Sequence, residues 1–296
     1  MIREKNAVIL AHYYQRNEIQ DIADYLGDSL YLSQMAKKTD KDLIVFCGVY
    51  FMAETAKILS PNKKVIIPDK EAGCSLADSC KREDLEKFIE RYPDHLVISY
   101  INCSAEVKAI SDIICTSGNV LKIVQSLPKE QKIIFAPDKN LGAYVNNMTG
   151  RNMILWDGSC EVHDIVTIEK VMELKVKYPK AKVIAHPECK AQILTMADYV
   201  GSTAGMLEFT KKDDNIEYIV ATESGIIHQM KKYNPGKNFH AVTSDSSCLC
   251  NECRFMKLIT LDKVLNGLQN ETFEILLDSK LIEDARAPIL RMLDLS

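Results

Sequence analysis

The sequence has no hydrophobic run long enough to cross a membrane. Its longest uncharged apolar stretch, Leu43 to Ala53, has 11 residues and contains Gly48, whereas a membrane-spanning helix needs about 20. A secretory signal is also lacking, because Arg3 and Lys5 are followed only by the short apolar segment VILA. We therefore expect no membrane association, and the cytoplasm is the predicted compartment.

The chain also lacks a strong net charge and a dense basic stripe. Its formal charge is -4, and the pairs Lys211–Lys212 and Lys231–Lys232 are typical of solvated helix faces. These features argue against a nucleic-acid partner. With 47% hydrophobic and 26% charged residues, the 296-residue chain can bury a large core. Its length suits two ordinary domains or three small ones.

A sequence pattern occurs three times, without gaps. The stretches begin at Val8, Val97 and Val183, and the third runs to Gly205 as VIAHPECKAQILTMADYVGSTAG. In each stretch, one residue stands 12 positions before an aspartate, and a hydroxyl residue follows that aspartate by five positions. The three sets are His12, Asp24 and Ser29; Tyr100, Asp112 and Ser117; and His186, Asp198 and Thr203. Self-similarity at a fixed period indicates repeated structural units.

Each repeat continues as alternating strand and helix patterns. Three short segments are predicted as central strands: Leu43–Cys47, Lys132–Ala136 and Glu217–Ala221. A helical pattern and a last short strand follow each of them, which gives a β-α-β-α-β-α-β unit. This alternation predicts an α/β fold with parallel sheets covered by helices on both faces. We expect three small αβα domains in a pseudo-threefold arrangement around a central metal cluster.

The repeats set the predicted domain limits. We expect αβα repeats at residues 1–80, 81–165 and 166–253. Residues 254–296 have no counterpart in the repeat, and they are predicted to form two helices and a strand that pack back on the body. Ligands of such sheets gather at the carboxyl ends of the strands.

Ten cysteines are many for a chain without a secretory signal, which favours metal binding or catalysis over disulfides. A cysteine follows the final strand of each repeat: Cys74, Cys160 and, in the third repeat, the group Cys248, Cys250 and Cys253. In a pseudo-threefold molecule these loops converge on one axis. Three thiolates that meet there need a metal to balance their charge. We predict Cys74, Cys160 and Cys253 as the ligands.

The other cysteines favour a plainer interpretation. Cys47 and Cys115 lie within strand patterns and are predicted core residues. Cys103 and Cys189 are rivals for metal binding, but Gln15 occupies the equivalent place in the first repeat. Their set is therefore incomplete.

Three cysteines are compatible with two kinds of metal site. They could hold zinc with a fourth ligand such as His163, or an iron–sulfur cluster. A [4Fe–4S] cluster with three cysteines leaves one iron open to act as a Lewis acid on a substrate.

Polar residues follow the first and second strands of each repeat, where they would surround the metal. His12 with Tyr14, Tyr100 with Asn102 and His186 with Glu188 follow the first strands, and Ser29, Ser117 and Ser202–Thr203 follow the second strands. Hydroxyl groups beside helix N-termini can bind carboxylate or phosphate, although simple N-capping explains any one of them. Imidazole and carboxylate can share proton transfer, and Tyr14 can act as a further acid.

Eight motifs are spread over nearly the whole chain. They are AHYYQ at 11–15, DIADYLGDSL at 21–30, AGCSLAD at 72–78, ICTSGN at 114–119, CEVH at 160–163, HPEC at 186–189, ADYVGST at 197–203 and FMKLITL at 255–261. With these motifs the sequence resembles the quinolinate synthase family, the NadA proteins of bacterial NAD biosynthesis.

The resemblance implies a transferase that condenses iminoaspartate with dihydroxyacetone phosphate to give quinolinate, phosphate and water. It implies an oxygen-sensitive [4Fe–4S] cluster and three αβα domains around it. A hand-over of unstable iminoaspartate from an L-aspartate oxidase or dehydrogenase is also expected. Relatives often carry a longer leader, so we expect a leading helix to be absent here.

Residue by residue, the resemblance implies cluster ligands at Cys74, Cys160 and Cys253, the last because it precedes Phe255. Tyr14, His186 and Glu188 are the implied catalytic residues. The implied substrate-binding residues are His12, Ser29, Tyr100, Ile101, Asn102, Ser117, His186, Pro187, Glu188 and Thr203.

Two other functions fit the same residues. One is a [4Fe–4S] hydro-lyase of hydroxy acids, which would use the same open iron. The other is a non-catalytic iron–sulfur or zinc sensor of a small dicarboxylate. The three polar sets argue against the sensor, because a structural metal does not need them.

Overall fold

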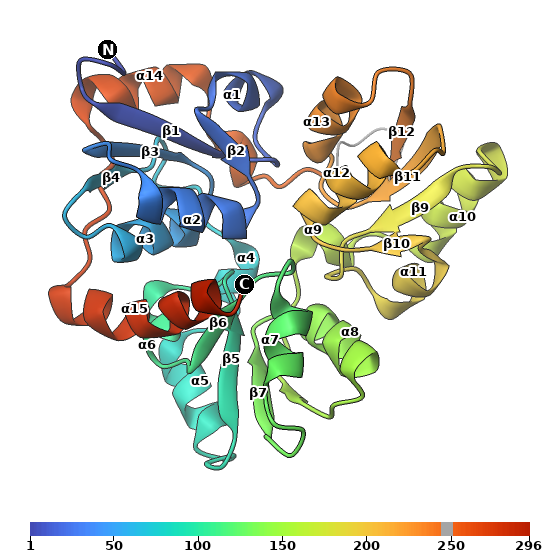
Figure 1. Cartoon of the computed structure of the whole chain (residues 1–296), viewed down its shortest axis with the longest axis horizontal. Coiled ribbons are helices and arrows are strands. Elements are labelled where there is room, and N and C mark those ends of the chain that lie inside the picture. Colours follow the sequence, from blue (N-terminus) through green and yellow to red (C-terminus); the bar gives the residue numbers. More distant parts are fainter. Residues whose placement is uncertain (244–250) are drawn as a thin grey trace.

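The computed structural model describes residues 1–243 and 251–296, and it forms three lobes around a common centre (Figure 1). The described residues contain three parallel four-stranded sheets, ordered β2-β1-β3-β4, β6-β5-β7-β8 and β10-β9-β11-β12. Each sheet therefore has the same strand order. This arrangement confirms the predicted α/β fold of three repeated units.

The first lobe contains four strands and four helices. They are β1 (Ala7–His12), α1 (Asn17–Ile22), β2 (Tyr25–Gly27), α2 (Ser29–Lys38), β3 (Leu43–Cys47), α3 (Tyr50–Leu59), β4 (Lys64–Ile66) and α4 (Ser75–Asp78). Every residue of β1 and β3 is buried, because helices cover both faces of the sheet.

The second lobe repeats this order after one additional helix. Its elements are α5 (Arg82–Ile89), β5 (Leu96–Tyr100), α6 (Ala105–Ala109), β6 (Ile113–Cys115), α7 (Val120–Ser126), β7 (Ile133–Ala136), α8 (Lys139–Thr149), β8 (Ile154–Leu155) and α9 (Glu161–Asp164). Cys115 and Cys47 are fully buried in their strands, as predicted.

The third lobe has a core of its own, with one apolar cluster on each face of its sheet. Its elements are α10 (Ile168–Lys177), β9 (Lys182–Ala185), α11 (Ala191–Met196), β10 (Tyr199–Val200), α12 (Thr203–Lys212), β11 (Glu217–Ala221), α13 (Ile226–Tyr233) and β12 (Asn238–Ala241). The predicted order of strand, turn, helix, strand and turn in residues 183–205 is confirmed.

The repeated aspartates hold the first two strands of each unit together. The Asp24 carboxylate accepts the Ile9 N–H (2.8 Å), and the Asp24 N–H donates to the Ile9 carbonyl (3.0 Å). Asp112 and Asp198 make the same two hydrogen bonds with Val97 and Val183. The repeated aspartate thus has a structural role, and we call its two hydrogen bonds to the first strand the aspartate clamp. The hydroxyl residue five positions later begins or precedes the next helix.

The C-terminal residues pack back on the first two lobes. They form a short 3-10 helix, η1 (Met256–Leu258), and two helices, α14 (Leu261–Asn270) and α15 (Ser279–Asp294). Helix α15 packs on α6, β6 and α3. The strand predicted between the two helices is a single antiparallel bridge between Ile66 and Glu274. Within the described part of the chain it pairs with β4, which is itself three residues long.

Within the described residues, no helix is long and apolar enough to cross a membrane.

Candidate active site

One cavity is lined by most of the predicted site residues, which come from all three lobes. The predicted residues that line it are His12, Tyr14, Ser29, Cys74, Tyr100, Asn102, Ser117, Cys160, His186, Glu188, Thr203 and Cys253. Ile101 and Pro187 are buried but are not among the lining residues. The cavity lies beyond the carboxyl ends of the strands, where parallel sheets bind their ligands.

The three cysteine loops are held by the same backbone hydrogen bond. In each lobe, the N–H of the third residue after the third strand donates to a carbonyl two residues before a cysteine. The pairs are Tyr50 with Ala72 (2.7 Å), Lys139 with Gly158 (2.8 Å) and Ser224 with Asn251 (3.3 Å). Cys74, Cys160 and Cys253 therefore occupy equivalent positions. Cys248 and Cys250 lie outside the described residues.

All three thiols are free and half-buried. Desolvation by the surrounding protein raises the pKa of Cys74 to about 12 and that of Cys253 to about 11, and it raises the pKa of Cys160 well above its usual range. Backbone N–H groups of the following turn oppose these rises. Each thiolate would also be disfavoured by the charge of the others, so a bound metal is the natural means of keeping all three ionised.

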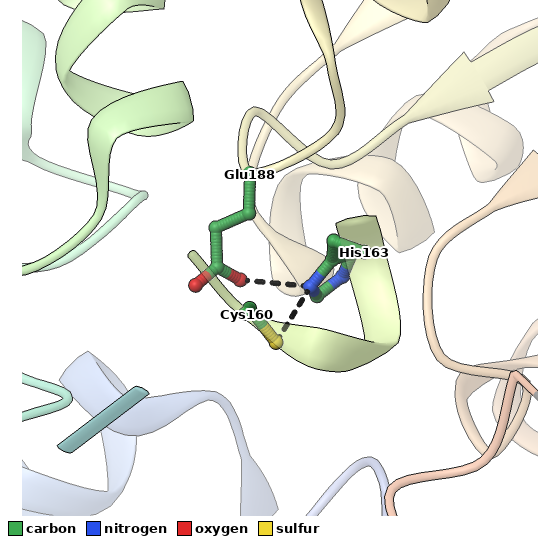
Figure 2. Close-up of side chains that lie close together, drawn as sticks. All are labelled: Cys160, His163 and Glu188. Atoms are coloured by element: carbon green, nitrogen blue, oxygen red, sulfur yellow. Dashed lines mark hydrogen bonds and ion pairs between the residues drawn. The ribbon is translucent and has the colours of Figure 1, made fainter. Parts of the chain in front are cut away.

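The spread of these thiols favours a multi-iron group over a single ion. Among the described residues, the group compact enough for one ion is Cys160, His163 and Glu188, whose ligand atoms lie within 4.8 Å of one another (Figure 2). The three cysteines do not form such a compact group. A cluster attaches its thiolates to different iron atoms, so the three loops fit an iron–sulfur cluster.

Glu188 bridges two imidazoles beside Cys160. Its Oε2 lies 3.1 Å from Nδ1 of His163 and 3.1 Å from Nδ1 of His186, and the two rings stack with centroids 4.7 Å apart. Figure 2 shows Glu188 reaching from its loop toward His163, which lies on the short helix α9 directly after Cys160. Burial favours protonation of Glu188, but the imidazoles outweigh it and hold the pKa of this carboxyl group below its usual range. Burial lowers the pKa of His186.

Hydroxyl groups extend this arrangement in both directions. Nε2 of His186 lies 3.1 Å from Oγ of Ser117, and Nε2 of His163 lies 2.9 Å from Oγ1 of Thr222. Thr222 is in turn 2.8 Å from the hydroxyl of Tyr14. A continuous chain of hydrogen-bonding groups therefore runs from Ser117 to Tyr14. Protons can move along such a chain.

Tyr14 and His12 present donors to the cavity. Burial raises the pKa of Tyr14 well above its usual range, so its hydroxyl stays protonated. The Tyr14 N–H donates to Nδ1 of His12 (3.1 Å), which leaves Nε2 of this imidazole as the protonated nitrogen. Burial lowers the pKa of His12 to about 3, with further lowering by His186. His12 is therefore a neutral hydrogen-bond donor.

The predicted anion-binding hydroxyls lie at helix N-termini. Ser29 is the first residue of α2 and Thr203 is the first residue of α12, and Ser117 lies just before α7. Ser202 and Asp28 cap α12 and α2, so the N–H groups of those first turns are only partly satisfied. This geometry suits carboxylate or phosphate groups.

Two buried acceptors on the cavity wall lack a hydrogen-bond partner within the described part of the chain. They are Oδ1 of Asn102 and Oε1 of Glu188. Buried polar atoms are rarely left unpaired, and each costs about 1–3 kcal/mol when it is. Both atoms indicate that the cavity is shaped for a ligand with hydrogen-bond donors.

The structure adds residues that the sequence analysis missed or underused. The sequence pattern indicates His163 only as a possible zinc ligand, and it does not single out Thr222, Glu223, Asp138 or Lys257. Asp138 and Glu223 each follow a third strand by two residues. That common repeat position was a signal available in the sequence. The rivals Cys103 and Cys189 are fully buried and do not line the cavity.

Comparison with known proteins agrees with this geometry. The family model described as Quinolinate synthetase A protein matches residues 1–294. A quinolinate synthase of Synechocystis sp. is 58% identical over 294 residues, which cover 99% of this chain and 92% of the relative. A quinolinate synthase of Chloroherpeton thalassium is 57% identical over 295 residues, with coverage of 99% and 92%. The chain therefore belongs to the quinolinate synthase (NadA) family.

Proposed function

We propose that this cavity condenses iminoaspartate with dihydroxyacetone phosphate to give quinolinate, phosphate and water for NAD biosynthesis. The observation that carries the proposal is the equivalence of the three cysteine loops, which carry Cys74, Cys160 and Cys253 to one cavity. Hydroxyl, imidazole and carboxylate groups line the same cavity. The family membership agrees with this activity.

Members of this family bind an iron–sulfur cluster, and we propose that the cluster is of the [4Fe–4S] type. Cys74, Cys160 and Cys253 would hold it, because these free thiols line the cavity. With three protein ligands, the cluster supplies a Lewis acid at the iron that no cysteine binds. This donor set is the one expected for a catalytic cluster rather than a structural one.

The substrates carry carboxylates and a phosphate, and the helix N-termini suit these anions. We propose that Ser29, Ser117 and Thr203 bind the carboxylates and, early in the reaction, the phosphate. His12 can donate from Nε2, and Asn102 and Tyr100 can fix the orientation of the substrate from the second lobe. Ile101 and Pro187 would act through the backbone of the loops that carry these residues.

We assign proton transfer to Tyr14, His186 and Glu188. Condensation and dehydration require protons to leave carbon and reach departing oxygen atoms. Glu188 is held as a carboxylate and can accept a proton, while Tyr14 stays protonated and can donate one. His186 and His163 flank the carboxylate and can pass its proton toward Ser117 or Thr222.

Two further proposals follow from the activity. Iminoaspartate is an unstable imine, so an L-aspartate oxidase or dehydrogenase would hand it over to this protein. The reaction would take place in the cytoplasm.

The test is the variant Cys160→Ala, purified without oxygen. We expect the loss of the cluster and of quinolinate formation, because one of three ligands is removed. Cys189→Ala is the matched control: this cysteine is fully buried in the third lobe, and we expect both properties to persist. Iron and sulfide analysis, absorption and EPR spectra and an anaerobic quinolinate assay measure the outcome.

A Cys160→Ala protein with a full cluster and full activity would contradict the proposal. Zinc without sulfide in the unaltered protein would favour the sensor. A cluster that dehydrates hydroxy acids without forming quinolinate would favour the hydro-lyase.

A further inference from the structure

In each lobe, one residue just after the third strand occupies an equivalent position, but its side chain differs from lobe to lobe. Val49, Asp138 and Glu223 each stand two residues beyond the end of β3, β7 or β11. The sheet registers establish that these positions are equivalent. The paired strand residues are Cys47 with Ala11, Ala136 with Ser99 and Ala221 with Ala185.

In the second and third lobes, this residue binds the backbone of a predicted cluster ligand. Oδ2 of Asp138 accepts the N–H of Cys160 (3.2 Å), and Oε1 of Glu223 accepts the N–H of Cys253 (3.1 Å). Both carboxyl side chains are 0% exposed. Two residues of different length thus make the same contact from equivalent positions.

Each carboxyl group is also anchored at its other oxygen. Oδ1 of Asp138 accepts the N–H of Leu141 (2.7 Å) as the cap of α8, and Oε2 of Glu223 accepts the N–H of Gly225 (2.6 Å). Both oxygens of each group therefore receive an N–H, and each group forms a rigid bridge from the end of a strand to a cysteine loop.

Glu223 carries one more contact that joins the lobes. Nζ of Lys257 lies 2.8 Å from Oε1 of Glu223 and donates to the carbonyl of Tyr14 (2.6 Å). The loop of Cys253 is thereby linked to the first lobe at the residue that carries the proposed catalytic hydroxyl.

Val49 cannot make the equivalent contact in the first lobe, because its side chain has no acceptor. The loop of Cys74 keeps the backbone bond from Tyr50 to Ala72 that all three lobes share, but among the described residues no carboxyl group accepts the N–H of Cys74. Two of the three predicted ligand cysteines therefore have their N–H bound by a carboxyl group, and the third does not.

We propose that Asp138 and Glu223 are positioning residues that fix Cys160 and Cys253 and withhold their N–H groups from the sulfur atoms of the cluster. This inference rests on the proposed function. Hydrogen bonds to cluster sulfur atoms are one of the factors that set the reduction potential, and fewer of them make it more negative. The two side chains thus favour the oxidised cluster, which suits Lewis-acid chemistry.

The variant Asp138→Asn tests this role. An amide has one acceptor oxygen, which can still cap α8 through Leu141, and its NH2 group then faces the N–H of Cys160. We expect chelator-driven loss of the cluster to become about 10-fold faster or more, as for other residues that support metal ligands. We also expect a less negative reduction potential, because the released N–H can turn toward sulfur.

Asp157→Asn is the matched control. Asp157 lies three residues before Cys160 but is 89% exposed and pairs only with Lys139 among the described residues. The same chemical change there is expected to leave both cluster stability and potential at wild-type values. Glu223→Gln is the second variant, with the same expected shifts, and it carries the test if Asp138→Asn does not fold.

EPR-monitored redox titration and iron release to a chelator, both anaerobic, measure the outcome. Wild-type values in Asp138→Asn and Glu223→Gln would overturn the inference, and so would equal shifts in Asp157→Asn. If the unaltered protein binds no cluster, the proposed function itself is wrong, which distinguishes the two failures.

Discussion

The hydroxyl of Thr222 connects two groups of side chains to which we assign proton transfer. It lies 2.8 Å from the Tyr14 hydroxyl and 2.9 Å from Nε2 of His163, which is buried. His163 leads on to Glu188 at 3.1 Å. Thr222 has neither charge nor a useful pKa, so its value lies in its position between an acid and a base.

Replacing Thr222 with valine keeps the shape of the side chain and removes the hydroxyl. We expect quinolinate formation to fall about 10²-fold, the lower range for loss of a positioned proton-transfer group. Cluster content should remain at the wild-type level. Thr210→Val is the control, since Thr210 is equally buried and bonds to Leu207 within α12. Equal rates of quinolinate formation by Thr222→Val and wild type would show that the hydrogen-bonded chain from Ser117 to Tyr14 has no part in catalysis.

The residues of the site differ in how far the sequence could predict them. Cys74, Cys160 and Glu188 were predicted because the repeat places each one at the end of a strand. The contacts of Thr222 and Glu223 depend on how the third lobe meets the first and on the path of the loop before Cys253. Sequence periodicity carries no information on contacts between lobes, so the repeat could mark the position of Glu223 but not the contacts that Thr222 and Glu223 make.

At the scale of the elements, the repeated aspartate explains why the sequence pattern has no gaps. Its carboxylate and its N–H both bind one residue of the first strand, so the spacing from strand to aspartate is fixed at 15 residues in every lobe. Insertions in the intervening turn and helix would break one of the two bonds. The fixed spacing is therefore a structural constraint, although the aspartates lie close in the sequence to candidate site residues.

Asp198→Ala removes one bond of this clamp in the third lobe. The Asp198 side chain accepts the Val183 N–H at 2.8 Å, and the residue is exposed. We therefore expect a loss of about 1 kcal/mol in the free energy of unfolding, the usual net value of one hydrogen bond. Denaturant unfolding measures it, with Asp214→Ala, an exposed aspartate of the same lobe, as the control. An unchanged midpoint would show that the carboxylate is dispensable.

The elements themselves were largely predictable from the sequence. The central strands were predicted within one residue, because short β-branched runs alternate with helical patterns. The strand expected between the two C-terminal helices is instead a single bridge, since the same apolar composition also suits a segment that covers a sheet edge. Composition alone does not distinguish these two outcomes.

At the scale of the whole molecule, a buried carboxyl group joins the first two lobes. Oε2 of Glu54 in α3 accepts the N–H of Ala105 (3.0 Å) at the start of α6, just after the loop that carries Tyr100 and Asn102. Nζ of Lys108, fully buried, donates to the carbonyl of Cys103 in the same loop. A loop of the candidate site in one lobe is thus supported by a helix of another.

Burial raises the pKa of Glu54 to about 7, against opposing contributions from Lys108 and the Ala105 N–H. Between its ordinary pKa of 4.5 and about 7, the folded protein keeps a proton that the unfolded chain releases. The contribution of this group to stability is therefore present at low pH and is lost as the pH rises through about 7.

Glu54→Gln should remove this pH dependence, because the amide oxygen can still accept the Ala105 N–H and no buried charge forms. We expect the variant to match the wild type near pH 4 and to exceed its free energy of unfolding by about 3 kcal/mol at pH 8. Denaturant unfolding at both values measures the difference, and Glu83→Gln, an exposed glutamate of α5 in the second lobe, is the control. A variant that is no more stable than the wild type at pH 8 would mean that Glu54 is ionised at little cost, and that charge rather than a neutral hydrogen bond joins the two lobes.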